Sequence, residues 1–254
     1  MAAALKGVLL GLVQGVTEFL PVSSSGHLVI FRTLLGSGTN AFNEIAFLHI
    51  ATLLAVFVYF RKGLVKLIAG FFGKKSESRR FVLFLFIASI PAGIAGLFFK
   101  DIIDSVFSGN SIFISLFFAI NSAVLITSDM KKTGSKKLNA FGSFIIGMFQ
   151  AVSVLPGVSR SGATISAGIF SGLDRKTAVV FSFYMSIPAV LFGNIFFSSF
   201  GVSQLTTADI LAFAAAFFSG LLAIRILITV VEKANLKFFG FYTLFAALVN
   251  LLLI

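Results

Sequence analysis

The chain has 254 residues, of which 58% are hydrophobic and only 11% are charged, with a net charge of +11 and a mean hydropathy of +1.05. Soluble domains carry roughly 25% charged residues, so this chain has too few charges to coat a water-facing surface, and both a soluble enzyme and a disordered chain are excluded. The complete lack of cysteine also excludes disulfides, thiol catalysis and cysteinyl metal sites.

Six stretches are long and apolar enough to cross a bilayer, which requires about 20 residues of helix. They contain Phe, Leu, Ile, Val and Ala without an alternating polar period, so they are predicted to be helices and not barrel strands. In chain order they are 42–60, 81–100, 111–128, 178–199, 208–231 and 238–254. The sequence therefore predicts an all-α integral membrane protein.

Two further regions, 1–36 and 138–172, are apolar but interrupted. Each has a helix-length apolar run, then a cluster of Pro, Ser and Gly, then a shorter apolar run. Such a cluster exposes backbone polar groups, which is tolerated at membrane depth only inside protein or beside a wet cavity. Both regions are predicted to be re-entrant helical hairpins.

The basic residues predict the orientation of the spans. Loops near 61–80 and 129–137, with Arg175-Lys176 and Lys233 to Lys237, are positive, and the loops between them contain no Lys or Arg. By the positive-inside rule the positive loops are cytoplasmic. Hairpin 1–36 is then on the outer side and hairpin 138–172 enters from the cytoplasm, so their tips are expected to meet near the midplane.

An internal repeat supports this arrangement. Residues 11–26 read GLVQGVTEFLPVSSSG and residues 147–162 read GMFQAVSVLPGVSRSG, with matching polar positions 136 residues apart. We predict a first repeat over 1–130 and a second over 131–254, each a hairpin followed by three spans. An odd number of crossings inverts the second copy, and in inverted repeats the site lies at the repeat interface.

The first hairpin carries an acid in an apolar run. Gln14 and Glu18 are four residues apart and share one helix face, and an intramembrane carboxylate indicates a functional site unless it caps a helix break. After Pro21 come hydroxyls, a glycine and a histidine that form a candidate anion nest with a candidate base or nucleophile: Ser23, Ser24, Ser25, Gly26 and His27. His49 lies within a span, where a buried histidine with satisfied hydrogen bonds is the favoured interpretation.

The second hairpin carries Arg160, the one charged residue between Lys137 and Asp174. A planar guanidinium suits phosphate oxygens, and a structural ion pair to Glu18 is the alternative interpretation. Further hydroxyl and N–H donors surround it: Ser159, Ser161, Gly162 and Thr164. Together the hairpins predict a phosphate-handling site, and a divalent cation on Glu18 would adapt it to hydrolysis of a diphosphate.

These two motifs resemble those of the undecaprenyl-diphosphate phosphatases of the BacA/UppP type. The resemblance covers essentially the whole chain and implies a plasma-membrane phosphatase that acts at the outer face, recycles the lipid carrier of cell-wall synthesis and is associated with bacitracin resistance. It implies a Mg²⁺ or Ca²⁺ ion on Glu18, with Gln14 as a neutral ligand. It also implies a catalytic role for His27, a diphosphate clamp at Arg160, and hydroxyl positions at Ser24, Ser159 and Thr164.

The residues leave several alternatives open. The nucleophile is His27 or a serine of 23–25, with Ser24 first. A transporter or flippase of prenyl phosphate lipids would need the same anion site, and charges of mixed sign disfavour a channel. The expected partners are a prenyl diphosphate lipid, membrane lipids and, as a further candidate, a second copy of the chain. No nucleic-acid partner is expected, because the positive charge is explained by topology.

Overall fold

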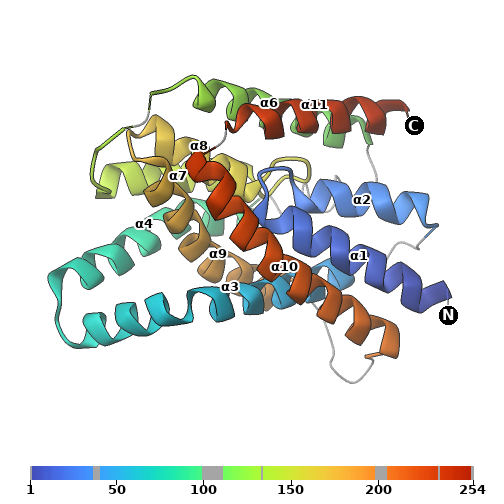
Figure 1. The fold of residues 1–254 in the computed structure, drawn as a ribbon, viewed down its shortest axis with the longest axis horizontal. Helices are drawn as coiled ribbons and strands as arrows, with labels where there is room; N and C mark the ends of the chain where they lie inside the picture. The colour runs from blue at the N-terminus through green and yellow to red at the C-terminus, as the bar shows by residue number, and fades with distance from the viewer. Residues whose placement is uncertain are drawn as a thin grey trace.

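The computed structural model describes all residues except 1, 37–40, 99–110, 133, 198–204, 234 and 253–254. All regular secondary structure in these described segments is helical, which confirms the predicted all-α membrane protein (Figure 1). The helices are α1 (Ala2–Phe19), α2 (Ser24–Leu34), α3 (Ala41–Phe72), α4 (Ser76–Phe98), α6 (Ser111–Asp129), α7 (Ala140–Val152), α8 (Arg160–Phe170), α9 (Arg175–Phe197), α10 (Thr207–Lys233) and α11 (Lys237–Leu252).

Five of the described helices are long and apolar enough to cross a bilayer, namely α3, α4, α6, α9 and α10. The sixth predicted span, 238–254, forms α11, whose 16 residues are fewer than the about 20 that a straight crossing needs. Its last two residues, like the acidic loop with Asp101 and Asp104, lie outside the described part. The sequence predicted six full spans, and five of the described helices are long and apolar enough to cross a membrane.

The two interrupted regions form pairs of helices separated by a break. α1 and α2 flank residues 20–23, and α7 and α8 flank residues 153–159. The helices of each pair contact one another, and the two breaks meet in the middle of the molecule (Figure 1). The breaks thus converge as predicted, whereas the re-entrant path through a membrane and its sidedness stay predictions.

Helices of the first half of the chain pack against helices of the second half. α1 runs along α10 of the second half, α7 runs along α4 of the first half, and α6 lies beside α11. Gly11 makes the first contact possible, since a Cβ there would lie 2.1 Å from the carbonyl oxygen of Ala212. Gly147, its counterpart in the second repeat, approaches Ala88 in the same way, with 2.4 Å to the carbonyl oxygen. Matching glycines therefore serve matching close contacts, although an inverted relation of the halves stays a prediction.

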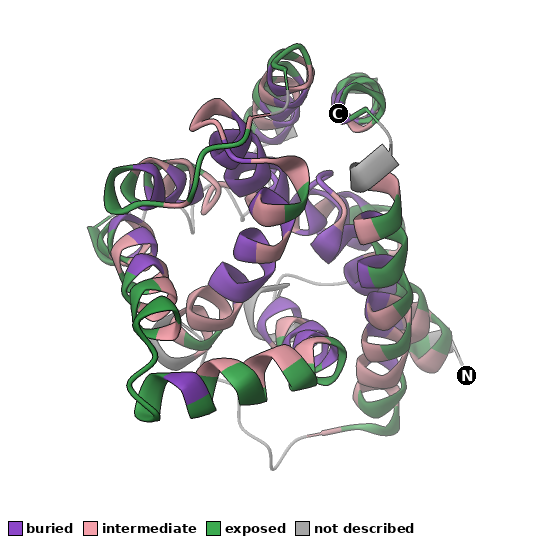
Figure 2. Cartoon of the chain, turned by 60° about the vertical axis from the view of Figure 1, so that its left-hand side comes forward, coloured by how far each residue is buried: buried purple, intermediate pink, exposed green. Residues whose placement is uncertain are grey.

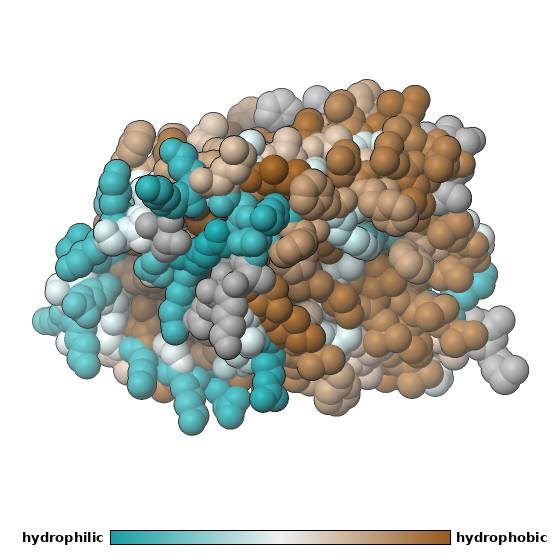
Figure 3. Space-filling model, turned by 45° about the horizontal axis from the view of Figure 1, so that its top comes forward, coloured by the Kyte–Doolittle hydropathy of each residue, from teal (hydrophilic) through white to brown (hydrophobic). Residues whose placement is uncertain are grey.

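The two ends of the molecule differ in polarity (Figure 3). Hydrophilic side chains gather at the end that carries the α3–α4 and α6–α7 connections, and hydrophobic side chains predominate elsewhere on the face seen in Figure 3. At the same end Asp129 accepts hydrogen bonds from Arg175 Nη2 (2.8 Å) and from the Leu236 N–H (2.9 Å). The basic segments thus share one end, as the positive-inside rule predicts for cytoplasmic loops.

The hydrophobic core surrounds α8, the second helix of the second hairpin. Figure 2 shows buried residues on the inward faces of the helices and exposed residues on the outward faces. α8 is buried over nine of its eleven residues, and Ile165, Phe181 and Met185 are among the most deeply buried side chains. This packing holds the breaks, and the polar groups on them, at the centre of the bundle.

Candidate active site

Each break is closed by a serine that caps the following helix. The Ser23 hydroxyl accepts from the Gly26 N–H (3.4 Å), and the Ser159 hydroxyl accepts from the Gly162 N–H (3.1 Å). These residues are 136 positions apart in pairs, so the repeat reproduces its capping chemistry. Ser23 has a positive φ of 68°, a strained conformation for a residue with a Cβ. Its hydroxyl also accepts from the Gly157 N–H (3.1 Å), which joins the two hairpins directly.

Asn121 of α6 connects both breaks. Its Nδ2 donates to the Pro21 carbonyl (3.1 Å) in the first hairpin, and its Oδ1 accepts from the Ser159 N–H (3.0 Å) in the second. Asn121 is almost fully buried. One amide thereby satisfies two backbone groups that the broken helices would otherwise leave unpaired. The sequence offered one signal for it, a lone Asn in the interior of a predicted span.

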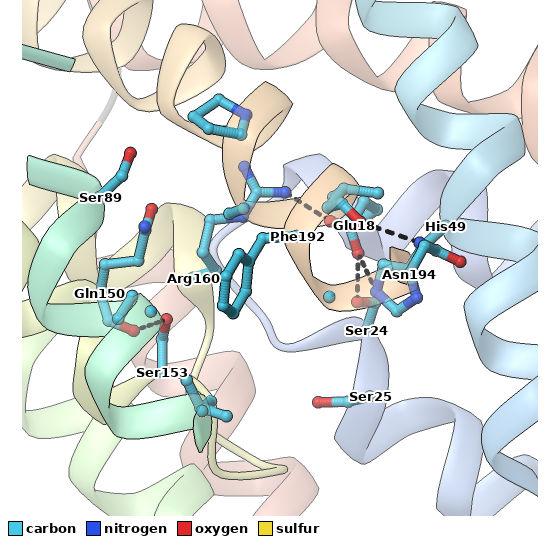
Figure 4. A pocket seen from close by; sticks show the side chains of 18 of the residues that line it. Glu18, Ser24, Ser25, His49, Ser89, Gln150, Ser153, Arg160, Phe192 and Asn194 are labelled. Carbon is cyan, nitrogen blue, oxygen red and sulfur yellow. Dashed lines mark hydrogen bonds and ion pairs between the residues drawn. The ribbon is translucent and has the colours of Figure 1, made fainter. Parts of the chain in front are cut away.

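Glu18 is the centre of a buried polar cluster. Its Oε1 accepts from Arg160 Nη2 (2.5 Å), and its Oε2 accepts from Ser24 Oγ (2.5 Å) and Gln14 Nε2 (3.1 Å). His49 Nε2 lies 3.3 Å from the same Oε2 (Figure 4). The predicted acid, the predicted guanidinium and one predicted serine are thus within contact distance. The ion pair between Glu18 and Arg160 also balances charge that would be costly to bury alone.

A cavity of about 530 Å³ opens onto this cluster. Its polar wall includes Glu18, Ser24 and Arg160, and its apolar wall comes mainly from α4 and α9. Phe86 and Ile90 of α4 line the cavity and are also 66% and 42% exposed, so the cavity reaches the hydrophobic outer surface. α4 and α9 each contain an internal proline, which removes a backbone hydrogen bond and loosens the helix locally. A space of this kind suits a ligand with an anionic end and an apolar chain.

His27 lies outside the wall of this cavity. Its Nδ1–H donates to the Ser23 carbonyl (2.7 Å), and its Nε2 accepts from the Tyr242 hydroxyl (2.8 Å). The ring also packs edge-on against Phe118. Both ring nitrogens therefore have hydrogen-bond partners. The bond from Nδ1–H to the Ser23 carbonyl stabilises the strained backbone of Ser23. Its predicted catalytic role stays a prediction.

The other predicted residues divide between the cavity wall and its support. Ser23, Ser25 and Ser159 line the cavity. Ser161 donates to the Leu20 carbonyl (3.1 Å) and so ties α8 to the first break, whereas Thr164 donates to the Arg160 carbonyl (2.8 Å) within α8. The two glycines allow close contacts: a Cβ at Gly26 would lie 2.6 Å from the Phe118 ring, and one at Gly162 would lie 3.1 Å from Asn121 Oδ1.

Known proteins match this chain over nearly its whole length. The family model described as bacitracin resistance protein BacA matches residues 7–249. The chain belongs to the BacA family. A relative from Methanococcus vannielii is 41% identical over 96% of this chain and 98% of its own length, and one from Thermosipho africanus is 40% identical over 95% and 97%. One from Christiangramia forsetii is 39% identical over 92% of both chains. All three are named undecaprenyl-diphosphatase, and none of these names denotes transport.

His49 lines the cavity of this BacA-family chain, although its sequence context within a span favoured a structural role. Besides its contact with Glu18, its Nδ1–H donates to the Ile45 carbonyl (2.8 Å), and the side chain lines the cavity. Both ring nitrogens of His49 have partners, as the sequence led us to expect, but the position of the side chain in the cavity wall was not expected. An ionisable residue within a span is itself a signal of function, and that signal was available in the sequence.

The predicted divalent cation would find one carboxylate in the cavity wall. Among the described residues no group of three or more His, Cys, Asp or Glu side chains could hold a metal ion. Gln14 is fully buried behind Glu18, does not line the cavity, and donates to the carboxylate. A magnesium ion is commonly held by one or two carboxylates together with substrate phosphates. Glu18 therefore fits a cation that is completed by a phosphorylated ligand, and a neutral ligand role for Gln14, whose Oε1 has no hydrogen-bond partner among the described residues, stays a prediction.

Proposed function

We propose that this chain hydrolyses undecaprenyl diphosphate to undecaprenyl phosphate and inorganic phosphate, the activity named in its relatives. The observation that carries this proposal is the Glu18 cluster at the polar end of an apolar cavity. Arg160 offers a guanidinium for a phosphate, and Ser24 offers a hydroxyl that already donates to a carboxylate. The exposed apolar lining from α4 leaves a path for a lipid chain into the bilayer.

Ser24 is the proposed nucleophile. Its Oγ attacks the terminal phosphorus while its proton passes to Glu18 Oε2, 2.5 Å away. An Oγ–P bond forms, the bond from that phosphorus to the bridging oxygen breaks, and prenyl monophosphate leaves with the proton from Glu18, which restores the carboxylate. Water then cleaves the phosphoserine and releases inorganic phosphate, with Glu18 as the base. His27 acts through Ser23, because its ring nitrogens are bonded to Ser23 and Tyr242.

Arg160 and the helix starts bind the phosphate charge. Arg160 is the first residue of α8, and its guanidinium pairs with Glu18. The N-terminus of α2 lines the same cavity with Ser23, Ser24 and Ser25. Helix N-termini favour anions. A Mg²⁺ or Ca²⁺ ion held by Glu18 and by phosphate oxygens would neutralise charge and polarise a phosphoryl oxygen. We place this site toward the outer leaflet, following the orientation that the basic loops indicate.

Phosphate release by the purified protein in detergent tests the proposal. Wild-type protein should release phosphate from a prenyl diphosphate, and a chelator should suppress this release. Ser24→Ala should lower kcat by at least about a thousandfold, whereas Thr33→Ala, which changes an exposed hydroxyl of the same helix, should retain activity. A phosphoserine trapped at Ser24 would support the mechanism. Near-normal turnover by Ser24→Ala would reject Ser24 as the nucleophile, and no release by the wild type would reject the activity.

A further inference from the structure

Gln150 of α7 lines the cavity and carries a buried amide that the proposed mechanism does not use. The residue is 2% exposed and lines the cavity. Neither its Nε2 nor its Oε1 has a hydrogen-bond partner among the described residues. A buried amide without partners is destabilising by about 1–3 kcal/mol. A side chain of this kind in a cavity wall indicates a polar ligand that supplies the bonds.

The repeat shows why this amide has no partner. Gln14, the counterpart of Gln150, donates to Glu18 four residues later on the same helix. Four residues after Gln150 comes Val154, which lies beyond the end of α7 at Val152 and whose side chain cannot accept a hydrogen bond. The first repeat therefore uses its glutamine to hold the carboxylate, whereas in the second repeat both amide atoms of the glutamine have no partner among the described residues.

Gln150 lies on the opposite side of Arg160 from the Glu18 cluster. Figure 4 shows Ser89, Gln150 and Ser153 on one side of the guanidinium, with Glu18 and its partners on the other. Ser89 Oγ donates to the Leu85 carbonyl (2.8 Å), and Ser153 Oγ donates to the Gln150 carbonyl (2.7 Å). The two hydroxyls are thus committed as donors to the backbone. Among the described side chains on this side, the Gln150 Nε2 is then a donor without a partner.

The side of the cavity that holds Gln150 is uncharged and adjoins the apolar wall. Ser89 is on α4, next to Ile90, and Phe86 is one turn earlier on the same helix. A diphosphate ester has two unlike ends: the terminal phosphate carries more charge, and the phosphate joined to the carbon chain carries less. The terminal phosphate suits Arg160 and the Glu18 cluster, whereas the esterified phosphate suits a neutral amide beside the apolar surface.

We propose that Gln150 binds the phosphate that is joined to the prenyl chain, which is the phosphate that stays on the product. This inference rests on the proposed function, because it assigns the second half of the same substrate. It predicts that prenyl monophosphate and inorganic phosphate occupy different parts of the cavity. Gln150 then contributes to binding of the lipid substrate and lipid product, and not to binding of the released phosphate.

Binding measurements on purified protein in detergent test the assignment without turnover. The probes are farnesyl monophosphate and inorganic phosphate, titrated separately into wild type and Gln150→Leu, which has a similar side-chain volume. Gln150→Leu should bind farnesyl monophosphate at least about tenfold more weakly, since a hydrogen bond to a charged group is lost. Its affinity for inorganic phosphate should stay within about twofold. In phosphate-release assays its KM should rise while kcat changes little.

Thermal melting separates this role from a structural one. Replacing an unpaired buried amide by a leucine should leave the melting temperature unchanged or raise it, so a fall of several degrees would overturn the assignment. Gln150→Asn, which withdraws the amide by one methylene, provides a second variant and should also weaken farnesyl monophosphate binding. Unchanged farnesyl monophosphate binding in both variants, or an equal loss for inorganic phosphate, would overturn it too. A wild-type protein that binds farnesyl monophosphate but releases no phosphate would reject the proposed function and leave this binding site standing.

Discussion

Asn121 should be a structural determinant of the site although it does not line the cavity. Replacing it with alanine removes the donor to the Pro21 carbonyl and the acceptor for the Ser159 N–H. Both backbone groups lie where the hairpins meet, and Asn121 itself is 1% exposed. Each buried group left unpaired costs about 1–3 kcal/mol. Asn121→Ala should therefore destabilise the fold by about 2–6 kcal/mol.

The effect should appear in two measurements. For a chain of this size 1 kcal/mol corresponds to roughly 2–4 °C in melting temperature, so Asn121→Ala should melt at least about 4 °C below the wild type in detergent. Phosphate release should fall as well, because the start of α8, which carries Arg160, is no longer held against the first hairpin. Thr127→Ala on the same helix removes only a hydroxyl that bonds within the helix and should change neither quantity appreciably. If Asn121→Ala melts within about 1 °C of the wild type, the two bonds do not hold the breaks together.

Three further changes test the packing of the helices. Gly11→Val should lower the melting temperature markedly, because its Cβ would meet the Ala212 carbonyl oxygen at 2.1 Å and overpacking costs about 1–3 kcal/mol or more; a normal melting curve would contradict the close α1–α10 contact. Asp129→Ala should cost about 2 kcal/mol or more in thermal melts, since it removes the ion pair with Arg175 and leaves the Leu236 N–H without its acceptor, and an unchanged melting temperature would refute this link. Asp174→Ala should cost about 1 kcal/mol at pH 7 through loss of the hydrogen bonds from Thr177 at the start of α9. Partial burial alone would raise the pKa of Asp174, but the Thr177 hydrogen bonds outweigh it and hold the pKa below its ordinary value. The stabilisation by Asp174 is therefore present above about pH 4, and the melting temperatures of the wild type and Asp174→Ala should converge as the pH falls below that. A difference that persists at low pH would refute the assignment.

The outcome for Glu18 and Arg160 shows what charge alone can predict. A carboxylate and a guanidinium in apolar segments must find partners, so their meeting across the two hairpins could be expected from composition and repeat. The glycine and serine pattern likewise predicted the breaks, because capped helix starts need those residue types. These predictions depend on the solvation of single groups, and neighbouring helices have little influence on it.

The two histidines show the opposite case. The sequence favoured His27 for the site and treated His49 as structural, whereas the structure puts His49 against Glu18 and binds both nitrogens of His27 to Ser23 and Tyr242. Tyr242 is on α11, far along the chain. Which face of a helix meets the cavity depends on packing against such distant helices, and no local pattern contains that information.

The sequence by itself determined the class of protein, the helices and their breaks, and the buried charges, because each follows from the cost of placing backbone or charged groups in hydrocarbon. Only the tertiary structure decided that Asn121 joins the breaks and that Gln150 faces the cavity while Gln14 supports Glu18. Two amides at equivalent positions of a repeat look alike along the chain. They differ in space because one has a carboxylate four residues later and the other has a valine there.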